Sequence, residues 1–121
     1  MKMTPFLEHI VYDIFGEEHP ITFRAMMGAH ILYYEGMTFA IVEGEELYFK
    51  GSEELGSWYL SHPESKQFMY TRAGEDTYLY YFLVPLALYE NVENKEIFYE
   101  WLHVALSVAK PPKPRKKKLV R

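Results

Sequence analysis

The sequence of 121 residues contains no cysteine. Disulfide bonds, thiolate nucleophiles, iron–sulfur clusters and cysteine-based zinc sites are therefore excluded. It also lacks a long apolar run, since the longest, YLYYFLVPLALY at residues 78–89, contains a central proline and is far shorter than the roughly 20 residues of a membrane helix. The first residues carry acids among the apolar ones and no cleavage pattern of small residues, so we expect a cytoplasmic protein without a signal peptide.

The motifs of common enzyme chemistries are missing as well. The sequence has no G-x-G-x-x-G, no Walker-type Gly-Lys-Ser/Thr and no G-x-S-x-G elbow. The five histidines are scattered, without histidine or cysteine partners at metal-ligand spacing. Glu100 and His103 form one Glu-x-x-His pair, but a di-iron site needs two such pairs and further carboxylates on four helices. We therefore expect a protein that is not an enzyme, with no catalytic residues, no metal and no cofactor.

Apolar and aromatic residues are plentiful. They make up 49% and 17% of the chain, and together with its length this predicts one domain with one core. Eleven residues are tyrosines, which suit half-buried sheet surfaces and interfaces because the ring is apolar while the hydroxyl can stay in water.

Charge is divided unevenly along the chain. Residues 1–109 hold 6 of the 13 Lys and Arg and all 17 Asp and Glu, a net charge of −11, whereas residues 110–121 carry +7. Pro111, Pro112 and Pro114 should end the preceding helix, so we interpret residues 110–121 as a flexible Pro/Lys/Arg-rich tail. An acidic body repels phosphates, so nucleic-acid contact should come mainly from the tail. The candidate DNA-contacting residues are Lys113, Arg115, Lys116, Lys117 and Lys118.

Hydrophobic periodicity and turn residues predict the order of the elements. The expected elements are a helix from Thr4-Pro5 to Gly16, strands at 30–34, 37–42 and 46–50 joined at Glu35-Gly36 and Glu43-Gly44, a short helix capped by Ser52, strands at 66–72 and 76–84, and a helix at 94–110 capped by Asn94. This order (α-β-β-β-α-β-β-α) predicts a single α+β domain at residues 1–109. Its antiparallel meander sheet should have about five strands, with the N-terminal, middle and C-terminal helices on one face.

The strand at 76–84 alternates two rows of side chains. Tyr78, Tyr80 and Phe82 form one row, and Leu79, Tyr81 and Leu83 form the other. One row should pack under the helices, which leaves the other as a candidate outward-facing surface.

The stretch RAMMGAHILYYEGMTFAIVEGEELYFKG at residues 24–51 resembles the N-terminal domain of the TfoX (Sxy) family of bacterial competence regulators. That family's pattern runs roughly Arg-x-Met-Phe-Gly-Gly-x-Gly-Ile-Tyr-x-Asp-Gly, then Met-Phe-Ala and Leu-Tyr-Leu-Lys. The similarity extends over residues 4–109 and includes FMYTRAGEDTYLYYFLVP and EWLHVALSVA. Met27 stands where the family has phenylalanine, and Ala29 and Ile31 replace glycines. The residues that we assign to the family pattern are Arg24, Met26, Gly28, Tyr33, Gly36, Phe39, Tyr48, Lys50, Tyr80, Tyr81, Pro85 and Trp101.

The resemblance implies a transcriptional accessory without known catalysis. Family members are understood to act beside the cyclic-AMP receptor protein, and many carry a second, helical domain where this sequence continues into its basic tail. We therefore expect a protein partner from the transcription machinery, no membrane, and weak non-specific DNA contact by the tail, because no helix with base-reading side chains is visible. A second interpretation stays open, in which the tyrosine-rich sheet of a protein-interaction or small-ligand module, as a homodimer or otherwise, is the working surface.

Overall fold

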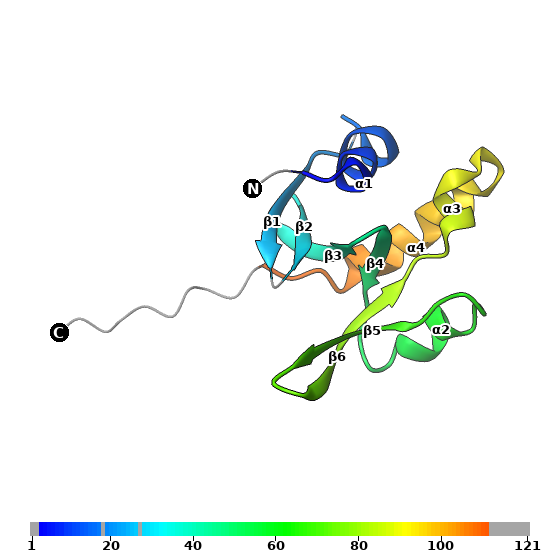
Figure 1. The fold of residues 1–121 in the computed structure, drawn as a ribbon. Helices are drawn as coiled ribbons and strands as arrows, with labels where there is room; N and C mark the ends of the chain where they lie inside the picture. Colours follow the sequence, from blue (N-terminus) through cyan, green and yellow to red (C-terminus); the bar gives the residue numbers. More distant parts are fainter. Residues whose placement is uncertain (1–2, 18, 27, 112–121) are drawn as a thin grey trace.

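Within residues 3–17, 19–26 and 28–111, which are the residues that it describes, the computed structural model forms one six-stranded antiparallel sheet with helices (Figure 1). The predicted α+β class is confirmed. The helices are α1 (Pro5–Glu8), η1 (His9–Phe15), α2 (Gly56–Leu60), α3 (Leu86–Glu90), η2 (Val92–Asn94) and α4 (Lys95–Ser107). The strands are β1 (Ile21–Met26), β2 (Ala29–Tyr34), β3 (Met37–Glu43), β4 (Glu46–Lys50), β5 (Gln67–Arg72) and β6 (Glu75–Leu83).

The sheet has one strand more than the sequence predicted. β1 to β4 form a meander, and the β5–β6 hairpin is added with β6 beside β4, so that β1 and β5 are the edges. β1 was not predicted because it is an edge strand with only half-buried apolar residues, among them Ile21 and Phe23. The turn at Glu35-Gly36 has positive φ at both residues, as a tight hairpin requires, whereas the next turn is Gly44-Glu45, one residue later than predicted.

The N-terminal helix begins as predicted and then widens. Thr4 caps it, because the Leu7 amide donates to the Thr4 hydroxyl at 3.1 Å. From His9 on it is a π-helix, and the Gly16 amide bonds to the carbonyl of Val11, five residues back. The wider turn buries Phe15 and leaves Ile14 only half-buried, whereas an α-helical spacing from the buried Ile10 would place Ile14 on the buried face.

The C-terminal part contains two elements that were not predicted, α3 and η2, between Pro85 and the last helix. α4 ends at Ser107, earlier than expected. Asn94 stands at the N-cap position of α4 as predicted, but its side chain makes no capping hydrogen bond, because its amide nitrogen donates to the Ala87 carbonyl at 2.9 Å instead. Ile97 is 46% exposed, although Trp101, one turn later on α4, is buried.

The main core lies between one face of the sheet and the helices. Tyr59 of α2 stacks on Phe82 of β6, with ring centroids 5.1 Å apart. Gly51 allows this approach, since a Cβ there would lie 2.9 Å from both rings. Trp101 of α4 packs against the same Tyr59 ring at 5.1 Å, so this cluster joins the middle and last helices to the sheet.

Candidate interaction surface on the open face of the sheet

The opposite face of the sheet, called the open face below, has its own small core. Its buried members all belong to strands: Ala29, Ile41, Tyr48, Phe68 and Tyr81. Met26 and Ile31, from the β1–β2 end of the sheet, pack against this cluster together with side chains of the β5–β6 hairpin. Ile41 is fully buried within this cluster.

A groove of about 530 Å³ lies at the border of this cluster. We call it the basic groove, because Arg24 of β1, Lys50 at the end of β4, and Lys110 beyond α4 all line it. Its other lining residues are Ala25, Met26, Ile31, Tyr33, Thr38, Tyr81 and Pro111. A second hollow of about 550 Å³ adjoins it and shares Lys50, Tyr81 and Lys110.

Two hydrogen bonds fix the position of Lys110. The Thr38 amide and the Thr38 hydroxyl both donate to the Lys110 carbonyl, at 2.7 and 3.0 Å. The pairing of β3 with β4 begins only at Ala40, so the chain after α4 forms an isolated antiparallel bridge to Thr38. Lys110, which the sequence groups with the tail, is thereby held at the sheet.

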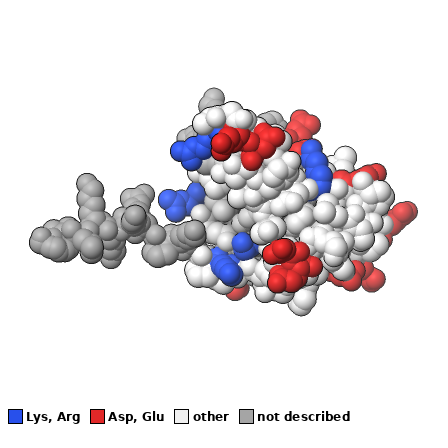
Figure 2. Space-filling model, turned by 90° about the horizontal axis from the view of Figure 1, so that it is seen from below, with Lys and Arg blue, Asp and Glu red and all other residues white. Residues whose placement is uncertain are grey.

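The basic groove concentrates positive charge on an acidic protein. Among the described residues its lining contains no Asp or Glu, and the ion pairs involve other groups. The Lys50 ammonium lies 5.1 Å from the centre of the Tyr81 ring. Burial, and next the charge of Lys110, lower the pKa of Lys50. Several basic side chains lie on the side where the described chain ends, and acidic ones predominate on the opposite side (Figure 2).

The β5–β6 hairpin extends beyond the end of β4 as a two-stranded arm (Figure 1). Met69 and Tyr78 are paired across it, and Tyr80 follows on the same face. These three side chains, called the aromatic arm below, are 39%, 60% and 49% exposed. The expectation that one whole row packs under the helices is correct only for Phe82, because the helices do not reach Tyr80 and Tyr78.

The other row, with Leu79, Tyr81 and Leu83, belongs to the cluster on the open face. Burial raises the pKa of Tyr81, against a hydrogen bond with Thr38 that lowers it, so the phenol stays neutral near pH 7. The hairpin is thus anchored on one side and exposed on the other.

The sequence model of the TfoX N-terminal domain matches residues 13–109. The chain belongs to the TfoX N-terminal domain family. This is a regulatory, non-catalytic family, and its domains are those of competence-related regulators. No curated protein matches the chain.

The residues of the TfoX pattern occupy different parts of the domain. Five of them line the basic groove: Arg24, Met26, Tyr33, Lys50 and Tyr81. Tyr80 borders the adjoining hollow, and Gly28 and Gly36 have positive φ at turns. Phe39 and Trp101 are buried on the helix side, Tyr48 is buried on the open face, and Pro85 is fully buried. The tail candidates Lys113, Arg115, Lys116, Lys117 and Lys118 lie outside the described residues, so their role stays a prediction.

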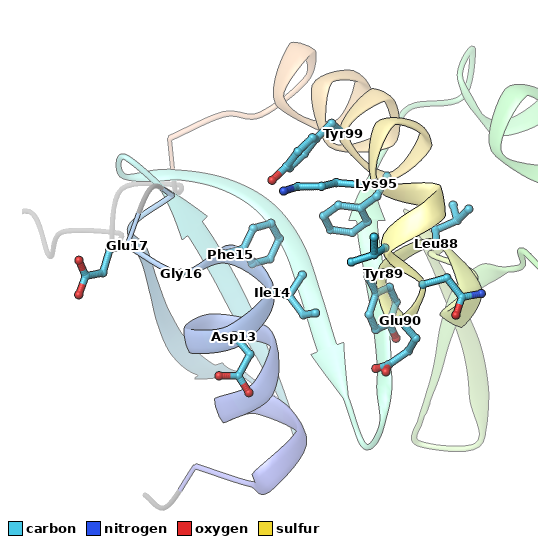
Figure 3. Close-up of a pocket in the computed structure, with 13 residues that line it drawn as sticks. Asp13, Ile14, Phe15, Gly16, Glu17, Leu88, Tyr89, Glu90, Lys95 and Tyr99 are labelled. Carbon is cyan, nitrogen blue, oxygen red and sulfur yellow. The ribbon is translucent and has the colours of Figure 1, made fainter.

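A third hollow of this TfoX domain, about 400 Å³, lies between the end of η1 and the α3–α4 region. Lys95 points into it toward Tyr99, with Phe15 and Ile14 opposite, and Asp13 and Glu90 lie at its edge (Figure 3). None of the TfoX pattern residues lines this hollow. We therefore regard the open face, and not this hollow, as the candidate site.

His9 connects the two sides of that hollow. Its Nδ1 lies 3.0 Å from Asp13 Oδ2 and its Nε2 lies 3.2 Å from Glu90 Oε2. The hydrogen bond with Asp13 raises the pKa of His9, burial opposes this, and Glu90 raises it further. The imidazolium form thus ties η1 to α3.

The part of the chain that the structure describes contains neither a cluster of metal-binding side chains nor a helix that could span a membrane. No group of three or more His, Cys, Asp or Glu side chains there is arranged to hold a metal ion. None of the helices in that part is long and apolar enough to cross a membrane.

Proposed function

We propose that this TfoX domain is a cytoplasmic, non-enzymatic transcriptional regulatory accessory of the competence type that acts by binding a protein partner. The observation that carries the proposal is the aromatic arm: Met69, Tyr78 and Tyr80 lie exposed on one face of a projecting hairpin. Tyrosine and methionine are enriched in protein interfaces, where the tyrosine ring packs and its hydroxyl finds a polar partner.

The anchoring of the arm suits this role. Phe68, Leu79 and Tyr81 hold its other face against the sheet, so the exposed rings are presented on an ordered support. A partner then loses little side-chain entropy when it packs against them. In this proposal the partner supplies promoter specificity, and the basic tail adds weak, sequence-independent DNA contact.

The test is affinity capture from the native cell with nuclease present. The double variant Tyr78→Ser/Tyr80→Ser should lose the partner that the wild type retains, and it should lower the transcript levels of competence genes. Tyr12→Ser is the matched control, because Tyr12 is 63% exposed but lies on η1. The proposal is wrong if the double variant and the control retain the same partner to the same extent.

A second candidate is a homodimer through the same hairpin. In the part of the chain that the structure describes, β5 is an edge of the sheet and pairs only with β6, so its outer backbone groups can accept a strand of a second copy. Light scattering distinguishes the candidates. A dimer that dissociates in the double variant would favour self-association, whereas a wild-type monomer would remove this second candidate.

A further inference from the structure

We propose that the basic groove binds the phosphate backbone of nucleic acid, so that the folded domain, and not the tail alone, contacts it. This goes beyond the function proposed above, which assigns DNA contact only to the tail. It rests on the convergence of Arg24, Lys50 and Lys110 in one hollow whose described lining residues include no carboxylate.

The few cations of the folded part are concentrated at the groove. Residues 1–109 contain six Lys and Arg, and two of them, Arg24 and Lys50, line the groove together with Lys110. Elsewhere Lys66 pairs with Glu46 at 3.4 Å and Lys95 lies 5.7 Å from the Tyr99 ring centre. On a body with a charge of −11, a hollow lined by cations and apolar walls is a local maximum of positive potential, which attracts an anion.

These cations are spread across the sheet. β1 and β4 are three strand spacings apart, so Arg24 and Lys50 are separated by roughly 14 Å along the sheet. Lys110 bridges to Thr38 on the side of β3 that β4 occupies further along, so it lies on the Lys50 side of the groove. Such a row is longer than one phosphate group and fits an extended polyanion. The guanidinium of Arg24 and the hydroxyl-bearing Tyr33 in the lining are donor types that proteins use on phosphate oxygens.

The connection to the tail favours nucleic acid over an acidic protein segment. Lys110 is the first of the seven basic residues at 110–121, which together with Arg24 and Lys50 make a series of nine cations in the sequence. Duplex DNA carries a negative charge every 1.7 Å or so of its axis and can neutralise the whole series. An acidic peptide would need about nine carboxylates in one segment.

The experiment measures binding of the full chain to a fluorescein-labelled 20-base-pair duplex of arbitrary sequence by anisotropy, between 50 and 200 mM salt. The groove variant is Arg24→Gln/Lys50→Gln/Lys110→Gln. The matched control is Lys66→Gln/Arg72→Gln/Lys95→Gln, which removes the same charge elsewhere. The groove variant should lower the slope of log affinity against log salt by about 0.9 for each phosphate that is no longer neutralised, and bind at least about tenfold more weakly than the control at 50 mM salt.

Three further variants keep the result interpretable. Arg24→Gln/Lys110→Gln changes only exposed side chains, so it serves if the triple variant fails to fold, and it should show about two thirds of the slope change. Lys116→Gln/Lys117→Gln/Lys118→Gln should lower the slope independently, because the tail makes separate contacts. Tyr78→Ser should leave duplex affinity unchanged, which separates this site from the aromatic arm.

Three results would overturn the proposal. The first is equal affinities and slopes for the groove and control variants, which would assign all binding to the tail and to net charge. The second is no binding of the wild type at 50 mM salt. The third is displacement of the duplex by a polyglutamate peptide at equal charge concentration, which would make the groove a site for an acidic protein segment.

Discussion

The two faces of the sheet bury side chains in different ways. On the helix side, residues from η1, α2, α3 and α4 close over the sheet, and rings such as Phe49 and Phe82 are fully buried. On the open face the buried cluster is made of strand residues, and its borders carry Arg24, Lys50 and Lys110. Stability therefore comes mainly from the helix side, which leaves charged groups on the open face available for a ligand.

The largest loss of stability should come from removing a buried side chain on the helix side. Phe49 lies between Phe39 and Phe98, with ring centroids 6.0 and 5.7 Å away. Phe49→Ala leaves a closed cavity there, so we expect the free energy of unfolding to fall by about 3–5 kcal/mol. Denaturant unfolding measures this loss.

Tyr48 provides the matched comparison, since it is the preceding residue of β4 and is buried on the open face. Tyr48→Ala should cost less, because the space that it leaves can open to water on a face that no helix residue of the cluster covers. Equal losses for the two variants would contradict the difference between the faces.

A smaller effect should follow from loosening the basic groove. In Thr38→Val the hydroxyl bond to the Lys110 carbonyl is lost, while the amide bond to the same carbonyl can remain. We expect a loss of about 1 kcal/mol in the free energy of unfolding. Hydrogen exchange of the amide at position 38 should also be faster, because the segment at Lys110 separates from β3 more often.

Thr71→Val is the control for this variant. Its hydroxyl also makes a hydrogen bond, to Asp76 at 2.8 Å, but in an exposed part of the hairpin. It should change stability by less and leave exchange at position 38 unchanged. If both variants altered that exchange alike, Thr38 would have no special role in holding Lys110.

Local signals in the sequence predicted local structure correctly. Thr4-Pro5 marks a helix start and Glu35-Gly36 a hairpin, because caps and turns depend on residues that are neighbours in the chain. The family pattern also predicted the α+β class, because it extends over nearly all the elements.

The basic groove could not be predicted in this way. Arg24, Lys50 and Lys110 come from β1, β4 and the segment after α4, and only the sheet order and the bridge to Thr38 bring them together. From the sequence alone, Lys110 is assigned to the tail, and Arg24 and Lys50 are assigned only to the TfoX family pattern. The π-helix was missed because its sequence also fits an α-helical stripe.

The smallest predicted effect concerns pH and the contact between η1 and α3 on the helix side. The pKa of His9 is raised in the folded state, so its contribution to stability is complete below the unfolded pKa of about 6.5 and is lost as pH rises through the higher folded pKa. The side chain is 37% exposed, so the contribution should stay under about 1 kcal/mol. Thermal unfolding of the wild type and of His9→Gln measures it, at a series of pH values from about 5.5 to about 9 that spans this pKa.

The difference in stability between the wild type and His9→Gln reports on His9, because the other titrating groups contribute equally to both. Their stabilities should differ most at the acidic end and converge at the alkaline end, where His9 is neutral in the wild type. His103→Gln removes an exposed histidine of α4 and serves as the control. If it reproduced the pH dependence of His9→Gln, the effect would reflect the loss of any histidine. If only His9→Gln shows it, the effect comes from the bond to Asp13 within η1 and the bond to Glu90 that joins η1 to α3.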